Sequence, residues 1–177
     1  NLIFRPRQDM NVRVNYGRTL ARPVMREMAP YANFDFVGGY MIRGNNKLQR
    51  TVIDNFDLRW EWFPSTLELV SVSAFYKIFQ NPIERAFEIL GGSQGSARQL
   101  QFRNVPEGRV YGLEFEGRKN LGFAWNGLKN FDAGFNFTVI QSAVDVPKDE
   151  LEINRYFRPE APSTRPMFAQ CPYLINA

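Results

Sequence analysis

Glu114 and Glu116 are the side chains whose types and spacing most resemble a catalytic pair. Alternate residues of a strand lie on one face about 7 Å apart, and glycoside hydrolases use two such carboxylic acids. The chain has no histidine and a single cysteine, so the commonest general base and metal ligand are missing. We therefore expect no enzyme, with no catalytic residue, metal site or cofactor. Both glutamates are interpreted as charges on the polar face of a strand, and a hydrolase that depends on them is the alternative.

A basic segment forms a second candidate, because Arg98, Arg103 and Arg109 flank Phe102. Cations interleaved with an aromatic ring can bind single-stranded nucleic acid. However, 22 Lys and Arg residues and 18 Asp and Glu residues are dispersed along the chain, so we expect no nucleic-acid partner. We interpret the segment as a solvated loop, with binding of an anionic metal chelate or charged glycan as the alternative. The glycines at residues 91–95 lack the Gly-Lys-Ser/Thr of a phosphate loop and predict a loop tip.

The elements that carry these side chains are predicted to be long strands. No apolar run approaches the roughly 20 residues of a membrane-spanning helix. Instead, apolar residues such as Phe56, Leu58 and Trp60 alternate with polar ones such as Asp57 and Arg59. Soluble strands most often have about 5 or 6 residues, whereas about 9 to 11 cross a bilayer. We predict complete strands at residues 10–20, 51–63, 67–79, 109–120 and 131–140, and partial strands at 1–5 and 173–177.

Short and long connections alternate strictly between these strands. The short ones are residues 6–9, 64–66 and 121–128, and the long ones are 21–50, 80–108 and 141–172. A transmembrane barrel has short turns at one rim and long loops at the other. The pattern therefore predicts an all-β fold, an antiparallel up-and-down transmembrane β-barrel segment with about five complete and two partial strands. A helical turn is predicted only at residues 23–28.

The cost of placing charge in lipid assigns the two faces of each strand. An Arg or Lys that faces lipid costs roughly 2 to 4 kcal/mol at mid-bilayer and about 0 to 1 near a rim. The charged faces are therefore predicted to line a lumen, and Trp60 and Trp62 on the apolar face to form an interfacial girdle. The lumen-facing candidates are Arg13, Arg59, Glu61, Glu114, Glu116 and Arg118, and the charged exceptions on apolar faces, all near rims, are Arg18, Asp54, Glu68, Lys119 and Lys129.

Several short segments, taken in order, form a family pattern. They are RTLARP at residues 18–23, REMAPY at 26–31, DNFDLRWEWFP at 54–64, VSAFYK at 72–77, NPIE at 81–84, VYGLEFEGRK at 110–119 and RPM at 165–167. Together they resemble the barrel of Bacteroidetes-type TonB-dependent receptors over nearly the whole chain. The resemblance implies that residues 1–177 are a partial barrel domain from the bacterial outer membrane, belonging to a barrel of about 22 strands.

The same resemblance implies the partners and the function. The partners are an N-terminal plug, the remaining barrel strands, outer-membrane lipid, TonB and an unknown small solute. The function is TonB-energised uptake of a scarce solute, such as a siderophore, another metal chelate, a glycan or a peptide. The plug and the C-terminal strands are not among these residues, and both ends of the chain look cut. Alone, the open strand edges and apolar face are expected to make it insoluble.

A soluble β-sandwich that binds carbohydrate through Trp and Tyr is the alternative from another class. It requires stacked sheets that enclose Trp60, Phe115 and Phe135 in a dry centre. Cys171 is expected to be an unpaired thiol without a role.

Overall fold

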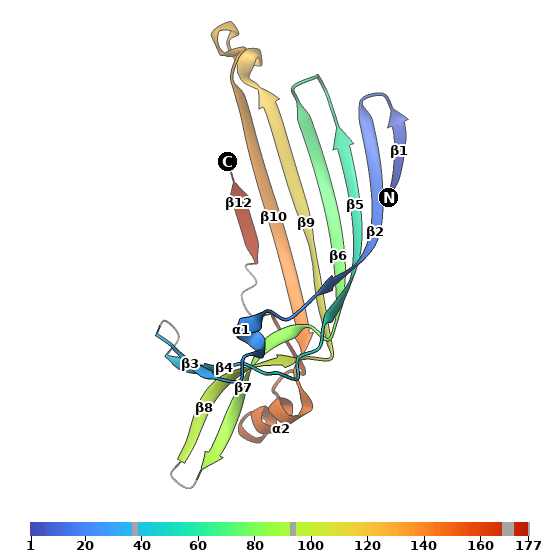
Figure 1. Cartoon of the computed structure of the whole chain (residues 1–177). Helices are drawn as coiled ribbons and strands as arrows, with labels where there is room; N and C mark the ends of the chain where they lie inside the picture. The colour runs from blue at the N-terminus through green and yellow to red at the C-terminus, as the bar shows by residue number, and fades with distance from the viewer. Residues whose placement is uncertain (37–38, 93–94, 168–171, 177) are drawn as a thin grey trace.

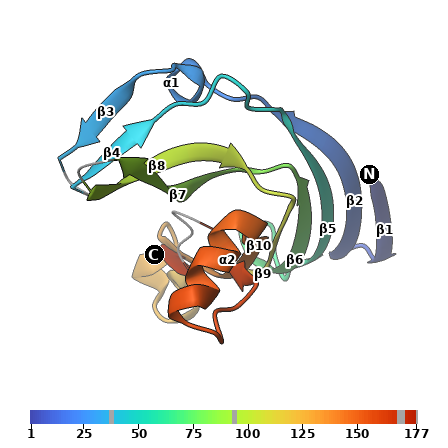
Figure 2. The same cartoon turned by 90° about the horizontal axis from the view of Figure 1, so that it is seen from below.

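The larger of two β-sheets forms a tall curved wall (Figure 1). The computed structural model describes residues 1–36, 39–92, 95–167 and 172–176. Neighbouring strands of the wall are antiparallel throughout, and Figure 2 shows β2, β5 and β6 side by side along an arc. The five complete strands and both partial strands predicted from the sequence are confirmed. In sheet order they are β1 Leu2–Arg7, β2 Met10–Ala21, β5 Thr51–Trp62, β6 Leu69–Gln80, β9 Glu107–Asn120 and β10 Asp132–Asp145, with β12 Tyr173–Asn176 paired to β10. The two-residue strand β11 Thr164–Arg165 also pairs with β10, although its residues were predicted to be part of a long connection.

The two ends of the wall differ in how its strands are joined, as predicted. Short connections join β1 to β2, β5 to β6 and β9 to β10 at the upper end in Figure 1. The last of these holds two 3-10 turns, η1 Leu121–Phe123 and η2 Asn126–Leu128, and the Asn120 side chain accepts a 2.9 Å hydrogen bond from the Gly122 backbone as η1 begins. The long segments all lie at the opposite end. We call these ends the turn end and the loop end.

The long segments are more ordered than the loop prediction implied. Two of them build a second sheet in the order β3-β4-β8-β7, whose central β4 and β8 are parallel. Its β7–β8 hairpin contains glycines 91, 92 and 95, and the rest of that predicted loop tip, residues 93–94, lies outside the described residues. Pairing between these segments gives hydrogen-bond partners to backbone N–H and C=O groups, which in isolated loops would bond to water instead. The strands are β3 Ala32–Asp35, β4 Tyr40–Arg43, β7 Ile83–Gly92 and β8 Gly95–Asn104.

Two helices complete the loop end. The helical turn predicted at residues 23–28 is confirmed as α1 Met25–Met28. The expectation of no other helix is wrong, because the third long segment forms α2 Lys148–Phe157. Pro147 precedes this helix, and Asp149 and Glu150 occupy its first turn. Carboxylates there stabilise the helix, because they lie at the positive end of its dipole. No described helix is long and apolar enough to cross a membrane.

In the wall, apolar side chains are exposed and polar ones are buried, which is the reverse of the distribution in a soluble domain. On the apolar face, Leu58 is 49% exposed, Leu113 is 45% exposed and Phe135 is 57% exposed, whereas on the polar face Glu61 is 7% exposed and Ser71 is 2% exposed. A dry sandwich centre is therefore absent around these described residues, and the β-sandwich alternative is wrong. The buried apolar side chains lie mainly toward the loop end, including Ala86, Leu100, Phe102, Val105 and Val144.

Candidate functional site

Strand register gathers five of the six predicted lumen-facing residues into two adjacent rows, and Arg118 lies outside these rows. One row runs across β2, β5, β6, β9 and β10, and the second lies two residues further along each strand, on the same face. The first row is Arg13, Arg59, Ser73, Glu114 and Thr138, and the second is Asn11, Glu61, Ser71, Glu116 and Asn136. We call these residues the polar rows.

A network of ion pairs joins four of the six candidates. Arg13 and Arg59 lie directly opposite each other, which would be unfavourable for like charges alone. Glu61 resolves this, because its two carboxylate oxygens accept hydrogen bonds from Arg13 Nε at 2.8 Å and Arg59 Nε at 2.9 Å. Arg59 also donates through Nη2 to Glu116 at 2.7 Å and through Nη1 to Ser73 at 3.1 Å. The network fixes side chains across four strands, β2, β5, β6 and β9.

The other two candidates lie on the same face but outside this network. Glu114 accepts a hydrogen bond from Asn136 Nδ2 at 3.1 Å. Arg118, nearer the turn end, donates to the backbone oxygen of Leu67 at 3.2 Å. The carboxylates of Glu114 and Glu116 are thus held by different partners, an amide and a guanidinium, rather than arranged as a cooperating acid pair.

Four of the five predicted charged exceptions pair with one another near the two rims of the apolar face, whereas Lys129 lies in the connection between η2 and β10. Near the loop end, Arg18 forms a two-pronged ion pair with Asp54 at 2.7 and 3.0 Å. Near the turn end, Lys119 contacts Glu68 at 2.9 Å. In the same region Trp62 donates its ring N–H to the Asp9 carboxylate at 3.0 Å, a contact suited to an interfacial indole.

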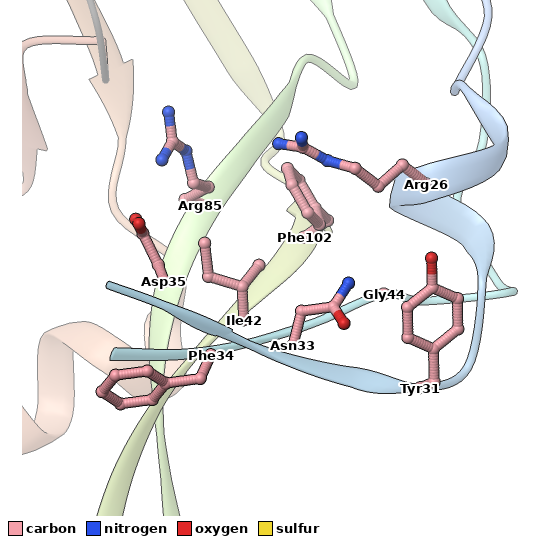
Figure 3. A pocket seen from close by; sticks show the side chains of 9 residues that line it. All are labelled: Arg26, Tyr31, Asn33, Phe34, Asp35, Ile42, Gly44, Arg85 and Phe102. Carbon is pink, nitrogen blue, oxygen red and sulfur yellow. The ribbon is translucent and has the colours of Figure 1, made fainter. Parts of the chain in front are cut away.

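A cavity of about 230 Å³ opens between the first and second long segments (Figure 3). The Arg26 side chain extends toward Phe102 from one side, and Arg85 and Asp35 lie on the other. Its walls therefore offer guanidinium groups, aromatic rings and one carboxylate. We call it the loop pocket; it is lined by Arg26, Tyr31, Asn33, Phe34, Asp35, Ile42, Gly44, Arg85 and Phe102.

Close backbone approach between segments shapes the loop pocket. A Cβ atom on Gly44 would lie 2.1 Å from the Ala29 backbone oxygen, so only glycine fits there without a shift of the main chain. The next residue, Asn45, donates its backbone N–H to the Glu27 backbone oxygen at 2.6 Å. Its side-chain amide donates to the Phe102 backbone oxygen at 3.1 Å. These bonds hold α1, β4 and β8 together around the cavity.

The third long segment, residues 141–172, contacts the second, residues 80–108, through two arginine side chains. Arg165 contacts Glu84 at 3.3 Å and donates to the backbone oxygen of Arg85 at 3.1 Å. Arg103 contacts Asp149 of α2 at 2.6 Å, and this hydrogen bond lowers the pKa of the Asp149 carboxyl. Burial raises the pKa of neighbouring Glu150.

The basic segment singled out in the sequence does not form one surface. Arg103 pairs with Asp149, whereas Arg109 pairs with Glu107 at 2.6 Å. Phe102 is buried in the loop pocket wall, and the side chain of Arg98 lies outside the described residues. Cys171 also lies outside them.

Sequence reasoning missed the loop pocket and its supporting elements. A signal for α2 was present, since Pro147 followed by Lys148, Asp149 and Glu150 is a typical helix start. A signal for the β7–β8 hairpin was present in the glycines at residues 91–95 between two apolar-rich runs. No local signal identifies the pocket itself, because its walls come from separate segments.

Comparison with known proteins identifies one family over most of the chain. The family model described as "TonB dependent receptor-like, beta-barrel" matches residues 1–163. A search of curated proteins finds no match.

Solved structures show the same fold. The siderophore receptor PirA from Pseudomonas aeruginosa matches with a TM-score of 0.56 and 19% identity, over 77% of this chain and 28% of that one. A mutant of the ferric enterobactin receptor PfeA from the same organism, in complex with enterobactin, matches with a TM-score of 0.56 and 18% identity, over 81% of this chain and 24% of that one. The chain thus spans about a quarter of the length of these receptors.

Proposed function

The chain belongs to the TonB-dependent receptor-like β-barrel family, and from that premise we propose that it is one part of a larger barrel that imports a scarce solute with energy transmitted by TonB. Members of this family are bacterial outer-membrane transporters and not enzymes. The observation that carries the proposal is the exposed apolar face of the wall, opposite the ion-paired polar rows. Such a distribution is stable where lipid covers the apolar side.

In this arrangement the polar rows and Arg118 face the lumen and the plug. An internal network suits that position, since paired charges can face an enclosed interior without each requiring full hydration. Cysteine labelling in the complete receptor tests the orientation. Cysteine at Glu114 should react with a membrane-impermeant reagent and cysteine at Leu113 with a lipid-soluble one. The opposite pattern would contradict the assigned faces.

The solute favoured by the loop pocket is an anionic one with aromatic groups. Arg26 and Arg85 supply positive charge to the cavity, and Phe102 and Tyr31 supply ring faces and edges. A siderophore or another anionic metal chelate fits these walls better than a neutral glycan or peptide. Support also comes from the fold, which is shared with receptors described as binding siderophores.

Binding by the complete receptor tests this assignment, with ferric enterobactin as the probe. Arg26→Gln should weaken binding about tenfold, because a hydrogen bond to a charged group contributes roughly 1.5 to 3 kcal/mol. Arg22→Gln is the matched control, because Arg22 is exposed and does not line the loop pocket. Equal affinities for the two variants would contradict capture of an anion at the loop pocket.

The finer assignment to a Bacteroidetes-type receptor stays a prediction that rests on motifs such as those at residues 54–64 and 110–119. The plug, TonB and remaining strands are proposed partners of the complete receptor. A coding sequence with a signal peptide, a plug domain before this segment and an aromatic-ended strand after it would support them. A coding sequence without a plug or further strands would contradict them.

A further inference from the structure

An apolar groove crosses the outer face of the wall near its turn end. Register places Trp62, Val70, Gly117 and Phe135 in one row across β5, β6, β9 and β10. The groove beside this row has a volume of about 570 Å³, within the roughly 300 to 1,000 Å³ typical of small-ligand sites. It is therefore large enough to hold more than a single side chain.

Gly117 forms the floor of this groove. A Cβ atom there would lie 2.3 Å from Cε1 of the Phe135 ring, so the ring lies directly over the glycine. Trp62 and Val70 continue the row on the other side and are 36% and 40% exposed. The missing side chain thus leaves a depression between aromatic and aliphatic walls.

A positive charge stands at the turn end of the groove. Lys119 lines it and is paired in register with Ala133, which also lines it. The Lys119 side chain is 56% exposed, whereas that of its ion-pair partner Glu68 is only 15% exposed. The ammonium group, which has three N–H donors, is therefore the more accessible charge of this ion pair. Arg118 also lines the groove and donates a hydrogen bond to the Leu67 backbone oxygen.

We propose that this groove holds one acyl chain of a membrane phospholipid, whose phosphate is bound by Lys119. The inference rests on the proposed function for the outward orientation of the apolar face. Lipid is then continuous with the groove, and the hydrogen-bonded Trp62 indole is at the level where polar and apolar regions of the bilayer meet. A phosphate beside Lys119 would lie at that same rim, with its acyl chain directed along the wall.

Lipid retention by the complete receptor in detergent tests the proposal by native mass spectrometry. The probes are dioleoylphosphatidylglycerol and dioleoylglycerol, which share acyl chains and differ in the phosphate headgroup. We expect the phospholipid to be retained over the neutral lipid. Lys119→Gln should reduce that retention about fivefold, since a basic residue contributes about 1 kcal/mol to binding anionic lipid. Ala133→Leu, which fills the groove from an exposed position, should reduce retention of the phospholipid more strongly.

Two matched variants serve as controls. Lys129→Gln removes an exposed cation near the same rim that does not line the groove, and Ala74→Leu adds the same bulk elsewhere on the apolar face. Both should retain phospholipid like the unchanged receptor. Equal retention of the two lipids, or equal retention by each variant and its control, would overturn the proposal. Heat-modifiable migration reports barrel folding for every variant.

Solute binding separates this proposal from the proposed function. All four variants should bind ferric enterobactin like the unchanged receptor, because the loop pocket lies at the other end of the wall. A receptor that retained phospholipid as expected but bound and imported no solute would contradict the function and leave the lipid site standing. A receptor that imported solute but showed no phospholipid preference would contradict the lipid site and leave the proposed function standing.

Discussion

Replacing Glu61 with Gln should destabilise the barrel more than any other single change of charge in the polar rows. The Glu61 carboxylate is the shared acceptor for Arg13, Arg59 and Asn11, at 2.8, 2.9 and 3.3 Å. Its loss leaves two opposed guanidinium groups without the anion between them. Glutamine keeps the shape and one acceptor oxygen but removes the charge.

The size of the effect follows from burial. Removing one partner of a fully buried ion pair costs about 3 to 5 kcal/mol. The side chains of Arg13 and Arg59 are 42% and 29% exposed, so water screens part of the interaction. We therefore expect Glu61→Gln to lower the free energy of unfolding by about 2 kcal/mol.

Urea unfolding of the complete receptor in lipid vesicles, followed by tryptophan fluorescence, measures this difference. Asp57→Asn is the control, because Asp57 lies on the same strand and face and accepts a 3.2 Å hydrogen bond from exposed Asn15. That change should cost less than about 0.5 kcal/mol. A double-mutant cycle with Arg13→Gln should show that the two losses are not additive.

A Glu61→Gln receptor as stable as the Asp57→Asn control would show that the Glu61 carboxylate does not hold the two guanidinium groups together. Additive losses for Glu61→Gln and Arg13→Gln would show the same, because the carboxylate would then not couple to the guanidinium. The slope of the unfolding free energy against urea concentration reports compactness. If this slope changes in Glu61→Gln, circular dichroism of the folded receptor checks its structure.

Three further predictions concern the rest of the chain. Gly44→Ala should weaken the anionic-solute binding proposed for the complete receptor severalfold, with ferric enterobactin as the probe, because the added Cβ forces the main chain apart at the loop pocket. Leu58→Arg, at the centre of the apolar face, should cost roughly 2 to 4 kcal/mol in vesicle unfolding, whereas Leu20→Arg near the loop-end rim should cost about 0 to 1. Because Arg103 lowers the pKa of Asp149, their pair should stabilise α2 above about pH 4, and this stabilisation should be lost as the pH falls through the lowered pKa. The hydrogen-exchange protection factors of residues 148–157, which are corrected for the intrinsic pH dependence of exchange, should therefore fall on acidification, and should fall less in Arg103→Gln than in the unchanged receptor.

The wall could be predicted from the sequence because its signals are local. Alternation in residues such as Leu58, Arg59 and Trp60 defines two faces without reference to any other strand. For the same reason, alternation and register place on one face Arg13, Arg59, Glu61, Glu114, Glu116 and Arg118. That this face lines a lumen stays a prediction. Which of them make ion pairs could not be predicted, because this depends on stagger between strands.

The loop end could be predicted only in part. The helical turn of α1 followed from residues 23–28, but α2 has too short an apolar stripe for helical periodicity to identify it. The second sheet depends on parallel pairing of β4 with β8, whose partners Ile42 and Leu100 are far apart in the chain. No residue spacing encodes such a pairing.

Strand lengths, the two chemical faces of each strand and the alternation of short and long connections are all encoded locally in the amino-acid sequence. These follow from side-chain alternation and from the cost of exposing charge to lipid, which act residue by residue. Three features depend instead on the folded arrangement: the ion-pair network around Glu61, the loop pocket between Arg26 and Arg85, and the groove over Gly117. Each of these is assembled from segments distant in the chain, and their contacts arise only once strand register and backbone approach bring those segments together.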